Sequence, residues 1–203
     1  MLAALATTLA VVAGATESGS VSLLMGQLGL WTGFVTTAVV ASRRFGAGAL
    51  RADFGFTITF VDMAKSAVIG IAVQVLVVPV IYFPLIAAGV DLDVSGAAEE
   101  LFRDLAGLEK VAIAVGVIAV APVAEELLFR GVLLRGLAQH LGDRGALWAT
   151  ALVFAGSHFQ VVQFPGLVAI GLTLAWLAQR TGGVAAPIWA HLAFNATTVA
   201  FLW

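Results

Sequence analysis

Apolar stretches long enough to cross a lipid bilayer fill most of this chain, and they limit its fold more than any other feature. A helix needs about 20 residues to cross the hydrocarbon core. Of the 203 residues, 61% are hydrophobic and 11% are charged, whereas an ordinary soluble domain is about a quarter charged. Too few polar side chains remain to cover a soluble globule. The sequence therefore predicts an all-α, polytopic transmembrane helical bundle.

Seven helices are expected in one bundle, with no internal repeat. The first stretch is short for a span, and we interpret it as a helix because it lacks the basic start of a signal peptide. Proline should bend the third, at Pro79 and Pro84. The expected helices are Leu2–Thr16, Val21–Ala41, Val61–Val90, Val111–Leu141, Ala146–Phe159, Phe164–Gln179 and Val184–Trp203. Residues 1–108 form an N-terminal part and residues 109–203 a core of this single membrane domain.

The charged loops predict an orientation. If the helices alternate in direction, seven of the ten basic residues fall on one side, whereas the loop Asp91–Glu109 on the other side is mainly acidic. The positive-inside rule then places the N-terminus and the Arg43-Arg44 loop in the cytoplasm. The loop from Ser42 to Phe60 is expected to carry a short interfacial helix.

The Ala-, Val- and Gly-rich composition is typical of a prokaryotic plasma membrane protein. The net charge of −2 gives no basic field for nucleic acid, and the absence of cysteine excludes disulfides and a thiol nucleophile.

Three charged residues stand inside an apolar run, where each unpaired charge costs about 2.5–3.5 kcal/mol at the bilayer centre. They are Glu125, Glu126 and Arg130. Glu126 and Arg130 are four residues apart, so they share a helix face and can pair. Glu125 points about 100° away from Glu126 and is expected to face a different neighbour. Pro122 lies one turn earlier and removes a backbone donor, which can kink the helix or open room beside the carboxylates.

Three further polar residues lie in the apolar spans. His158 is expected at the end of the fifth helix, and His191 and Asn195 share one face of the seventh. Histidines inside a membrane usually face the bundle interior. A carboxylate, two histidines and an asparagine that meet there would supply a base for water and hydrogen-bond donors for an oxyanion. This set suits the hydrolysis of an amide without a covalent intermediate.

These residues resemble the three motifs of the CAAX protease and bacteriocin-processing family, also called CPBP or Abi, which includes type II CAAX prenyl endopeptidases. The family motifs are Glu-Glu-x-x-x-Arg, Phe-x-x-x-His and His-x-x-x-Asn, in this order. The chain has Glu125-Glu126-Leu-Leu-Phe-Arg130, Phe154-Ala-Gly-Ser-His158 and His191-Leu-Ala-Phe-Asn195. The resemblance covers residues 109–203. The stretch Arg51-Ala-Asp-Phe-Gly-Phe is also similar to an Asp-x-Gly-x element that often precedes this core.

The resemblance implies an integral membrane endopeptidase that hydrolyses a peptide bond of a membrane-associated protein or peptide. Its partners would be membrane lipid and that substrate. Glu125 would activate water, His158 would hold or help to activate it, and the ion pair of Glu126 with its arginine would organise the site. Oxyanion stabilisation would fall to His191 and Asn195. A cavity open towards the cytoplasm is expected.

Two questions stay open at this point. The family is commonly called a metalloprotease family, so a divalent metal such as zinc could sit on Glu125, His158 and His191. The chain lacks His-Glu-x-x-His, and we favour water activation by glutamate without a cofactor. The second question is function, because a non-enzymatic scaffold or a bacteriocin self-immunity protein could share the fold. A small transporter with a proton-relay carboxylate is a third reading, which inverted repeats would favour.

Overall fold

The computed structural model describes residues 20–103 and 105–203, and within these ranges it contains helices and no strand. The predicted all-α class is confirmed, whereas the first expected helix, Leu2–Thr16, lies outside the described residues. Segments labelled η are π-helical turns, in which each backbone N–H bonds five residues back. The elements are α2 (Ser20–Phe45), α3 (Leu50–Phe54), α4 (Phe60–Ala72), η1 (Val73–Val77), α5 (Val78–Ala87), α6 (Gly96–Phe102), α7 (Gly107–Val115), η2 (Gly116–Val120), α8 (Ala121–Glu126), η3 (Leu127–Leu133), α9 (Leu134–Gly156), α10 (Phe164–Thr181) and α11 (Ala185–Leu202).

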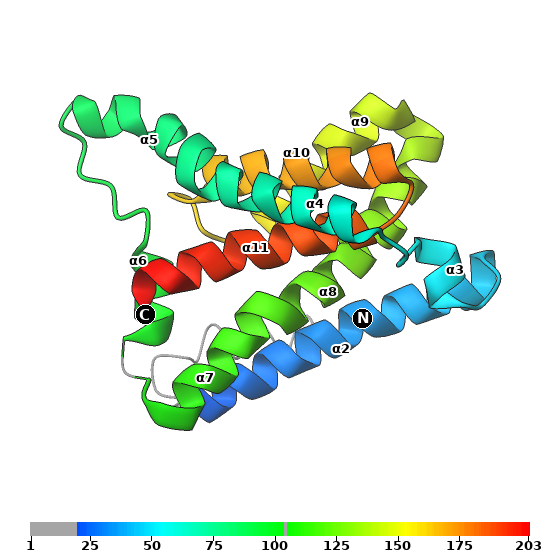
Figure 1. Cartoon of the computed structure of the whole chain (residues 1–203), viewed down its shortest axis with the longest axis horizontal. Coiled ribbons are helices and arrows are strands. Elements are labelled where there is room, and N and C mark those ends of the chain that lie inside the picture. Colours follow the sequence, from blue (N-terminus) through cyan, green and yellow to red (C-terminus); the bar gives the residue numbers. More distant parts are fainter. Residues whose placement is uncertain (1–19, 104) are drawn as a thin grey trace.

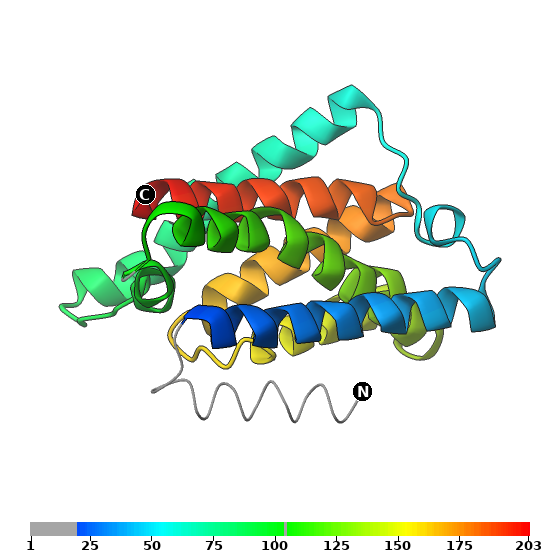
Figure 2. The same ribbon diagram turned by 90° about the horizontal axis from the view of Figure 1, so that it is seen from below.

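Helix α11 runs through the middle of the bundle (Figure 1). It packs against α4, α10 and the η2–α8 region, and α10 packs in turn against α9. Helix α2 lies along α8 and η3 on the other side (Figure 2). The charged motif on α8 and η3 therefore lies in the interior, next to the helix that carries the second histidine motif.

Three described helices are long and apolar enough to cross a membrane. They are Phe60–Ala87, Gly107–Gly156 and Ala185–Leu202. The second is 50 residues long, but Gly142 has φ 66° and ψ 173°, so the chain turns there. A left-handed φ is readily adopted by glycine. The turn falls between the predicted helices Val111–Leu141 and Ala146–Phe159, which are therefore two helices.

The end of α9 differs from the prediction, because His158 follows the helix and does not end it. The helix stops at Gly156, and His158 lies in the turn that leads to α10. Two side chains bind the carbonyl of Phe154 here: the hydroxyl of Ser157 at 2.7 Å and Nδ1 of His158 at 2.8 Å. Such side-chain bonds compete with the helical backbone bonds.

Two of the three π segments precede a proline. Pro79 follows η1 and Pro122 follows η2, each two residues after the segment ends. A proline inside a helix lacks an N–H and collides with the carbonyl four residues before it. The wider π turn relieves that collision without ending the helix. The third segment, η3, begins after Glu126 and contains Arg130.

Small residues let α4 and α11 approach closely. A Cβ atom on Gly70 would lie 1.9 Å from the carbonyl oxygen of Ala190. Ser66, one turn earlier on α4, is also buried. Small residues four apart are a common way to bring membrane helices into contact. This contact sets the position of α11 immediately beside His191.

A clasp at one end of the bundle holds α3 in place, and we define it by Ser42, Asp53, Arg135 and Gly182–Ala185. The Asp53 carboxylate accepts hydrogen bonds from the Ser42 hydroxyl at 2.5 Å and the Ala47 N–H at 2.8 Å. These bonds, that of Ser42 first, lower the pKa of the Asp53 carboxyl below its ordinary value. Arg135 donates to the carbonyls of Asp53 and Gly182.

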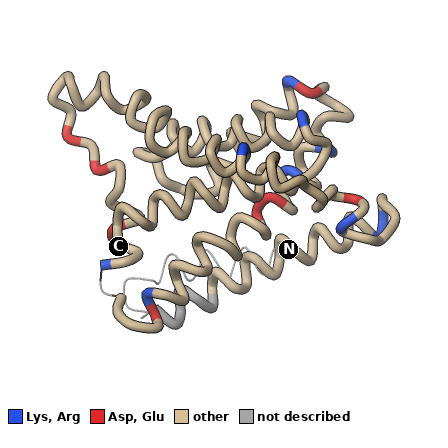
Figure 3. Tube along the Cα trace, viewed as in Figure 1, with Lys and Arg blue, Asp and Glu red and all other residues tan. Residues whose placement is uncertain are grey.

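The backbone completes the clasp. The N–H of Val184 donates to the Phe54 carbonyl at 2.8 Å, and the N–H of Ala185 to the Gly55 carbonyl at 3.3 Å. Phe54 is buried in a cluster with Leu127. The short helix expected between Ser42 and Phe60 is therefore present, and it packs on the bundle. Figure 3 shows basic residues gathered at this end, with acidic residues in the loop after α5 at the other.

Candidate active site

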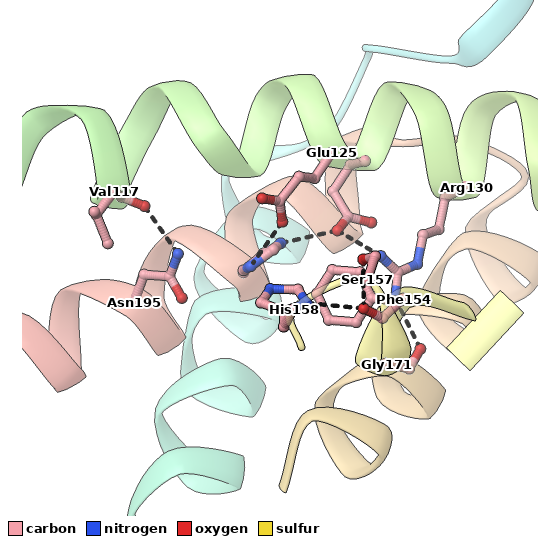
Figure 4. A network of polar contacts seen from close by, with 10 residues as sticks. Val117, Glu125, Arg130, Phe154, Ser157, His158, Gly171 and Asn195 are labelled. Atoms are coloured by element: carbon pink, nitrogen blue, oxygen red, sulfur yellow. Dashed lines mark hydrogen bonds and ion pairs between the residues drawn. The ribbon is translucent and has the colours of Figure 1, made fainter. Parts of the chain in front are cut away.

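A fully buried ion pair lies at the centre of the site (Figure 4). Nη1 of Arg130 is 2.8 Å from Oε1 of Glu126, and neither side chain has exposed surface. Nη2 of Arg130 donates to the Gly171 carbonyl at 2.9 Å. The guanidinium also lies 4.6 Å from the ring centroid of Phe154, a cation–π distance. The pairing predicted from the four-residue spacing is confirmed, and α10 contributes a backbone acceptor to it.

His191 bridges the two glutamates. Its Nδ1 lies 2.9 Å from Oε1 of Glu126, and its Nε2 lies 3.8 Å from Oε2 of Glu125. The expectation that Glu125 faces a different neighbour from Glu126 was wrong. The two nitrogens of an imidazole lie on different edges of the ring, so one histidine on α11 reaches both carboxylates.

The two carboxylates differ in their access to solvent and in their partners. The Glu125 side chain is 15% exposed, whereas that of Glu126 is completely buried. Glu126 has both an arginine and a histidine within hydrogen-bond distance. Glu125 has the looser contact with His191 at 3.8 Å. Glu125 is therefore the carboxylate of the pair that solvent can reach.

His158 lies beside the same aromatic ring as His191. The ring centroid of Phe154 is 4.8 Å from that of His158 and 5.7 Å from that of His191. The Nδ1–H of a neutral His158 can donate to the Phe154 carbonyl, 2.8 Å away. That tautomer leaves Nε2 of His158 as an acceptor. Phe154 thus orients both histidines of the sequence motifs, one through its carbonyl and its ring, the other through its ring.

Asn195 has a backbone partner. Its Nδ2 donates to the carbonyl of Val117, in η2, at 2.8 Å. One amide hydrogen of Asn195 is therefore committed to the neighbouring helix, and the other is left for a ligand. The structure thus ties Asn195 to Val117 of η2 (Figure 4).

Sequence reasoning missed the carbonyls of Val117 and Gly171 as parts of the site. Every residue has a backbone carbonyl, so the residue type at these two positions does not show that the carbonyl takes part in the site. The one available signal for Val117 is Pro122, five residues later, because a proline leaves a carbonyl of the preceding turn without a backbone donor.

The residues described do not contain a group of three or more His, Cys, Asp or Glu arranged to hold a metal ion. The Nδ1 atoms of the two histidines have partners, the Phe154 carbonyl for His158 and Glu126 for His191, so Nε2 is the nitrogen of each ring that could coordinate a metal. The chemistry below is derived from the side chains alone.

Two pockets adjoin the motif helices. One, of about 170 Å³, lies between the start of α9 and the end of α10 and is lined by Arg130, Arg135 and Gln179 among others. It lies at the basic end of the bundle, and of the motif residues Arg130 alone is among those that line it. The other, of about 540 Å³, lies between α2 and η2–α8 and is almost entirely apolar; Trp31 and Ala124 are among its lining residues.

Fold and site together define an integral membrane protein of the helical class, with a glutamate, histidine and arginine site buried among its helices. Residues 107–197 match the family model described as type II CAAX prenyl endopeptidase Rce1-like. This match supports an assignment to the CAAX protease family, a family of peptidases, which the three motifs also predict. Among curated proteins and solved structures, none matches the chain.

Proposed function

We propose that this protein is an intramembrane endopeptidase in which Glu125 activates the attacking water. The observation that carries the proposal is the contrast between the two neighbouring carboxylates. Glu126 is buried and paired with Arg130, whereas Glu125 is partly exposed and contacts His191 at 3.8 Å. The family match supports a peptidase in general. The substrate would be a membrane-associated protein or peptide.

The charges of the cluster favour a shared proton. Two carboxylates and one guanidinium leave one negative charge, and a buried net charge is costly in a membrane. One proton held by Glu125 or His191 makes the cluster neutral. Glu126 accepts from Nδ1 of His191, so the other ring nitrogen faces Glu125. A base and an acid that share one proton suit hydrolysis, which first takes up a proton and later returns it.

The reaction then proceeds in two balanced steps. Glu125 takes one proton from water as the water oxygen bonds to the scissile carbonyl carbon, and the carbonyl oxygen becomes an oxyanion. The protonated Glu125 next gives this proton to the leaving nitrogen. The carbon–nitrogen bond breaks, the carbonyl re-forms, and an acid and an amine leave. The free amide hydrogen of Asn195 and a protonated Nε2 of His191 would stabilise the oxyanion.

His158 would orient the water. Its Nδ1 is occupied by the Phe154 carbonyl, so Nε2 is the nitrogen available to accept a hydrogen bond from it. Water would come from the basic end of the bundle, which the positive-inside rule assigns to the cytoplasm. This orientation in a prokaryotic plasma membrane is part of the proposal.

Substitution of one carboxylate at a time tests the mechanism. Purified Glu125→Gln protein in liposomes should lose cleavage of a membrane-anchored peptide library by about 10²- to 10⁴-fold, the usual effect of removing an acid–base group. Glu100→Gln, at an exposed position of α6, is the matched control and should keep full activity. Cleavage by Glu125→Gln at the control rate would overturn the mechanism. If wild type cleaves nothing but retains a membrane partner, the scaffold or self-immunity function holds instead.

Chelation tests the role of a metal separately. We expect exhaustive treatment with a chelator to leave cleavage unchanged. Activity that is lost on chelation and restored by zinc would replace water activation by Glu125 alone with a metal-dependent mechanism.

A further inference from the structure

Pro122 leaves one carbonyl of η2 without a backbone donor. In this π segment the N–H of Ala121 donates to the carbonyl of Gly116, five residues before it. The next donor in the same register would be residue 122, and its acceptor would be Val117. Proline has no N–H, so the Val117 carbonyl receives no hydrogen bond from this position.

Asn195 supplies the missing donor. Its Nδ2 lies 2.8 Å from the Val117 carbonyl oxygen. A backbone carbonyl without a partner is costly in a membrane, where no water replaces the lost hydrogen bond, so this acceptor favours the contact with the amide. The bond also fixes which way the amide points, because only one of its two hydrogens can face Val117. The second hydrogen is then held in one direction relative to His191, one turn away on the same helix.

We propose that Pro122 is a positioning residue for Asn195: by withholding an N–H from Val117, it creates the acceptor that orients the asparagine amide for the oxyanion. The inference deepens the proposed function and rests on it for the role of the amide. The proposal gives a role to a proline that lies one turn before Glu126 and does not contact the reacting atoms.

The chain contains a matched arrangement without an asparagine. Pro79 follows η1 as Pro122 follows η2, and the N–H of Val78 donates to the Val73 carbonyl, again five residues back. The carbonyl that Pro79 leaves without a donor is that of Gln74. In the described part of the chain, no side chain donates to it. Pro79→Ala is therefore a control that restores an N–H in the same local geometry, away from Asn195.

Asn195 is the only asparagine in the chain, so its amide can be observed alone. The probe is the full protein in detergent micelles, with ¹⁵N-asparagine as the only label. The side-chain amide of wild type should show one hydrogen shifted downfield and protected from exchange. In Pro122→Ala the new N–H competes for Val117, and the pair should move towards the positions and exchange rate of a free amide. In Pro79→Ala the pair should stay at its wild-type position.

Activity supplies the second readout. Pro122→Ala should lower kcat by about 100-fold, the scale of a misplaced catalytic contact, with KM unchanged. Its thermal midpoint should equal or exceed that of wild type, because alanine restores a helical hydrogen bond. A merely structural proline would not lower kcat while it preserved stability.

Three results would overturn the proposal: an unmoved amide pair in Pro122→Ala, an equal movement in Pro79→Ala, or a moved pair with wild-type kcat. If wild type does not cleave peptides, the proposed function fails. The amide spectrum still decides whether Pro122 holds Asn195.

Discussion

The buried site and the clasp both contain an arginine and a carboxylate, but they use them differently. In the site, Arg130 is 1% exposed and binds the carboxylate of Glu126 directly. In the clasp, Arg135 is exposed and binds backbone carbonyls, one of which belongs to Asp53 itself. The Asp53 carboxylate is satisfied by a serine hydroxyl and backbone N–H groups.

The difference follows from solvation. A buried charge needs a countercharge because no water replaces it, and the loss of either partner leaves the other unpaired. An exposed charge is hydrated and needs no countercharge, so an exposed arginine can use its N–H groups to bind backbone carbonyls instead. The comparison teaches that the ion pair in the site determines whether the core can form, whereas the clasp charges only adjust how α3 is held.

The largest effect should come from breaking the buried pair. Arg130→Met leaves Glu126 buried without its arginine and should lower the free energy of unfolding by about 3–5 kcal/mol. The double variant Glu126→Leu with Arg130→Met should recover much of this stability, because both charges are removed, and should remain inactive. Denaturant titration in mixed micelles measures both. An equal stability loss in the single and double variants would contradict the comparison.

A medium effect on stability is expected from a substitution in the clasp, where the backbones of Gly55 and Gly183 lie close together. A Cβ on Gly183 would lie 2.4 Å from the Gly55 carbonyl oxygen, so Gly183→Ala should cost about 1–3 kcal/mol of unfolding free energy. Gly136→Ala is the control, because a Cβ there meets nothing within 4 Å. Thermal unfolding of the two variants should differ. Equal midpoints would show that the clasp backbone is free to move apart.

A smaller, pH-dependent effect should come from Asp53. Its pKa is lowered in the folded protein, chiefly by the Ser42 hydroxyl. Its contribution to stability is therefore present above the pKa of the unfolded chain and is lost as the pH falls through the folded value. The protection factor of the Val184 amide against hydrogen exchange, which reports the hydrogen bond to α3, should fall in acid below about pH 4. In Asp53→Asn the protection factor should already be lower at neutral pH and should lose this dependence on acid. The same acid response in both proteins would assign it to another group.

The smallest effect should come from Lys65 and Asp62, an exposed pair on α4. Their charged atoms are 3.9 Å apart, and the side chains are 70% and 54% exposed. Lys65→Ala should change the unfolding free energy by less than about 0.5 kcal/mol. A loss of the size expected for Arg130→Met would show that exposure does not separate the two kinds of charge.

Much of the site was predictable from residue spacing. The pairing of Glu126 with Arg130 follows from four residues on one helix, and it was predicted correctly. The contact of His191 with both glutamates was not predictable, because it depends on how closely α11 approaches α8. The sequence also places Pro122 beside the site. It does not reveal that the side chain of Asn195 donates to the Val117 carbonyl, which Pro122 cannot do because it has no N–H.

The sequence alone determined that this is an all-α membrane bundle and which polar residues lie within its apolar stretches. The physical reason is that lipid tolerates only apolar helices and makes every exception costly, so the exceptions stand out. The tertiary structure decided that Glu125 keeps access to solvent, that His191 joins it to Glu126, and that backbone carbonyls hold Arg130 and Asn195. These depend on contacts between helices far apart in the chain, which local spacing does not encode.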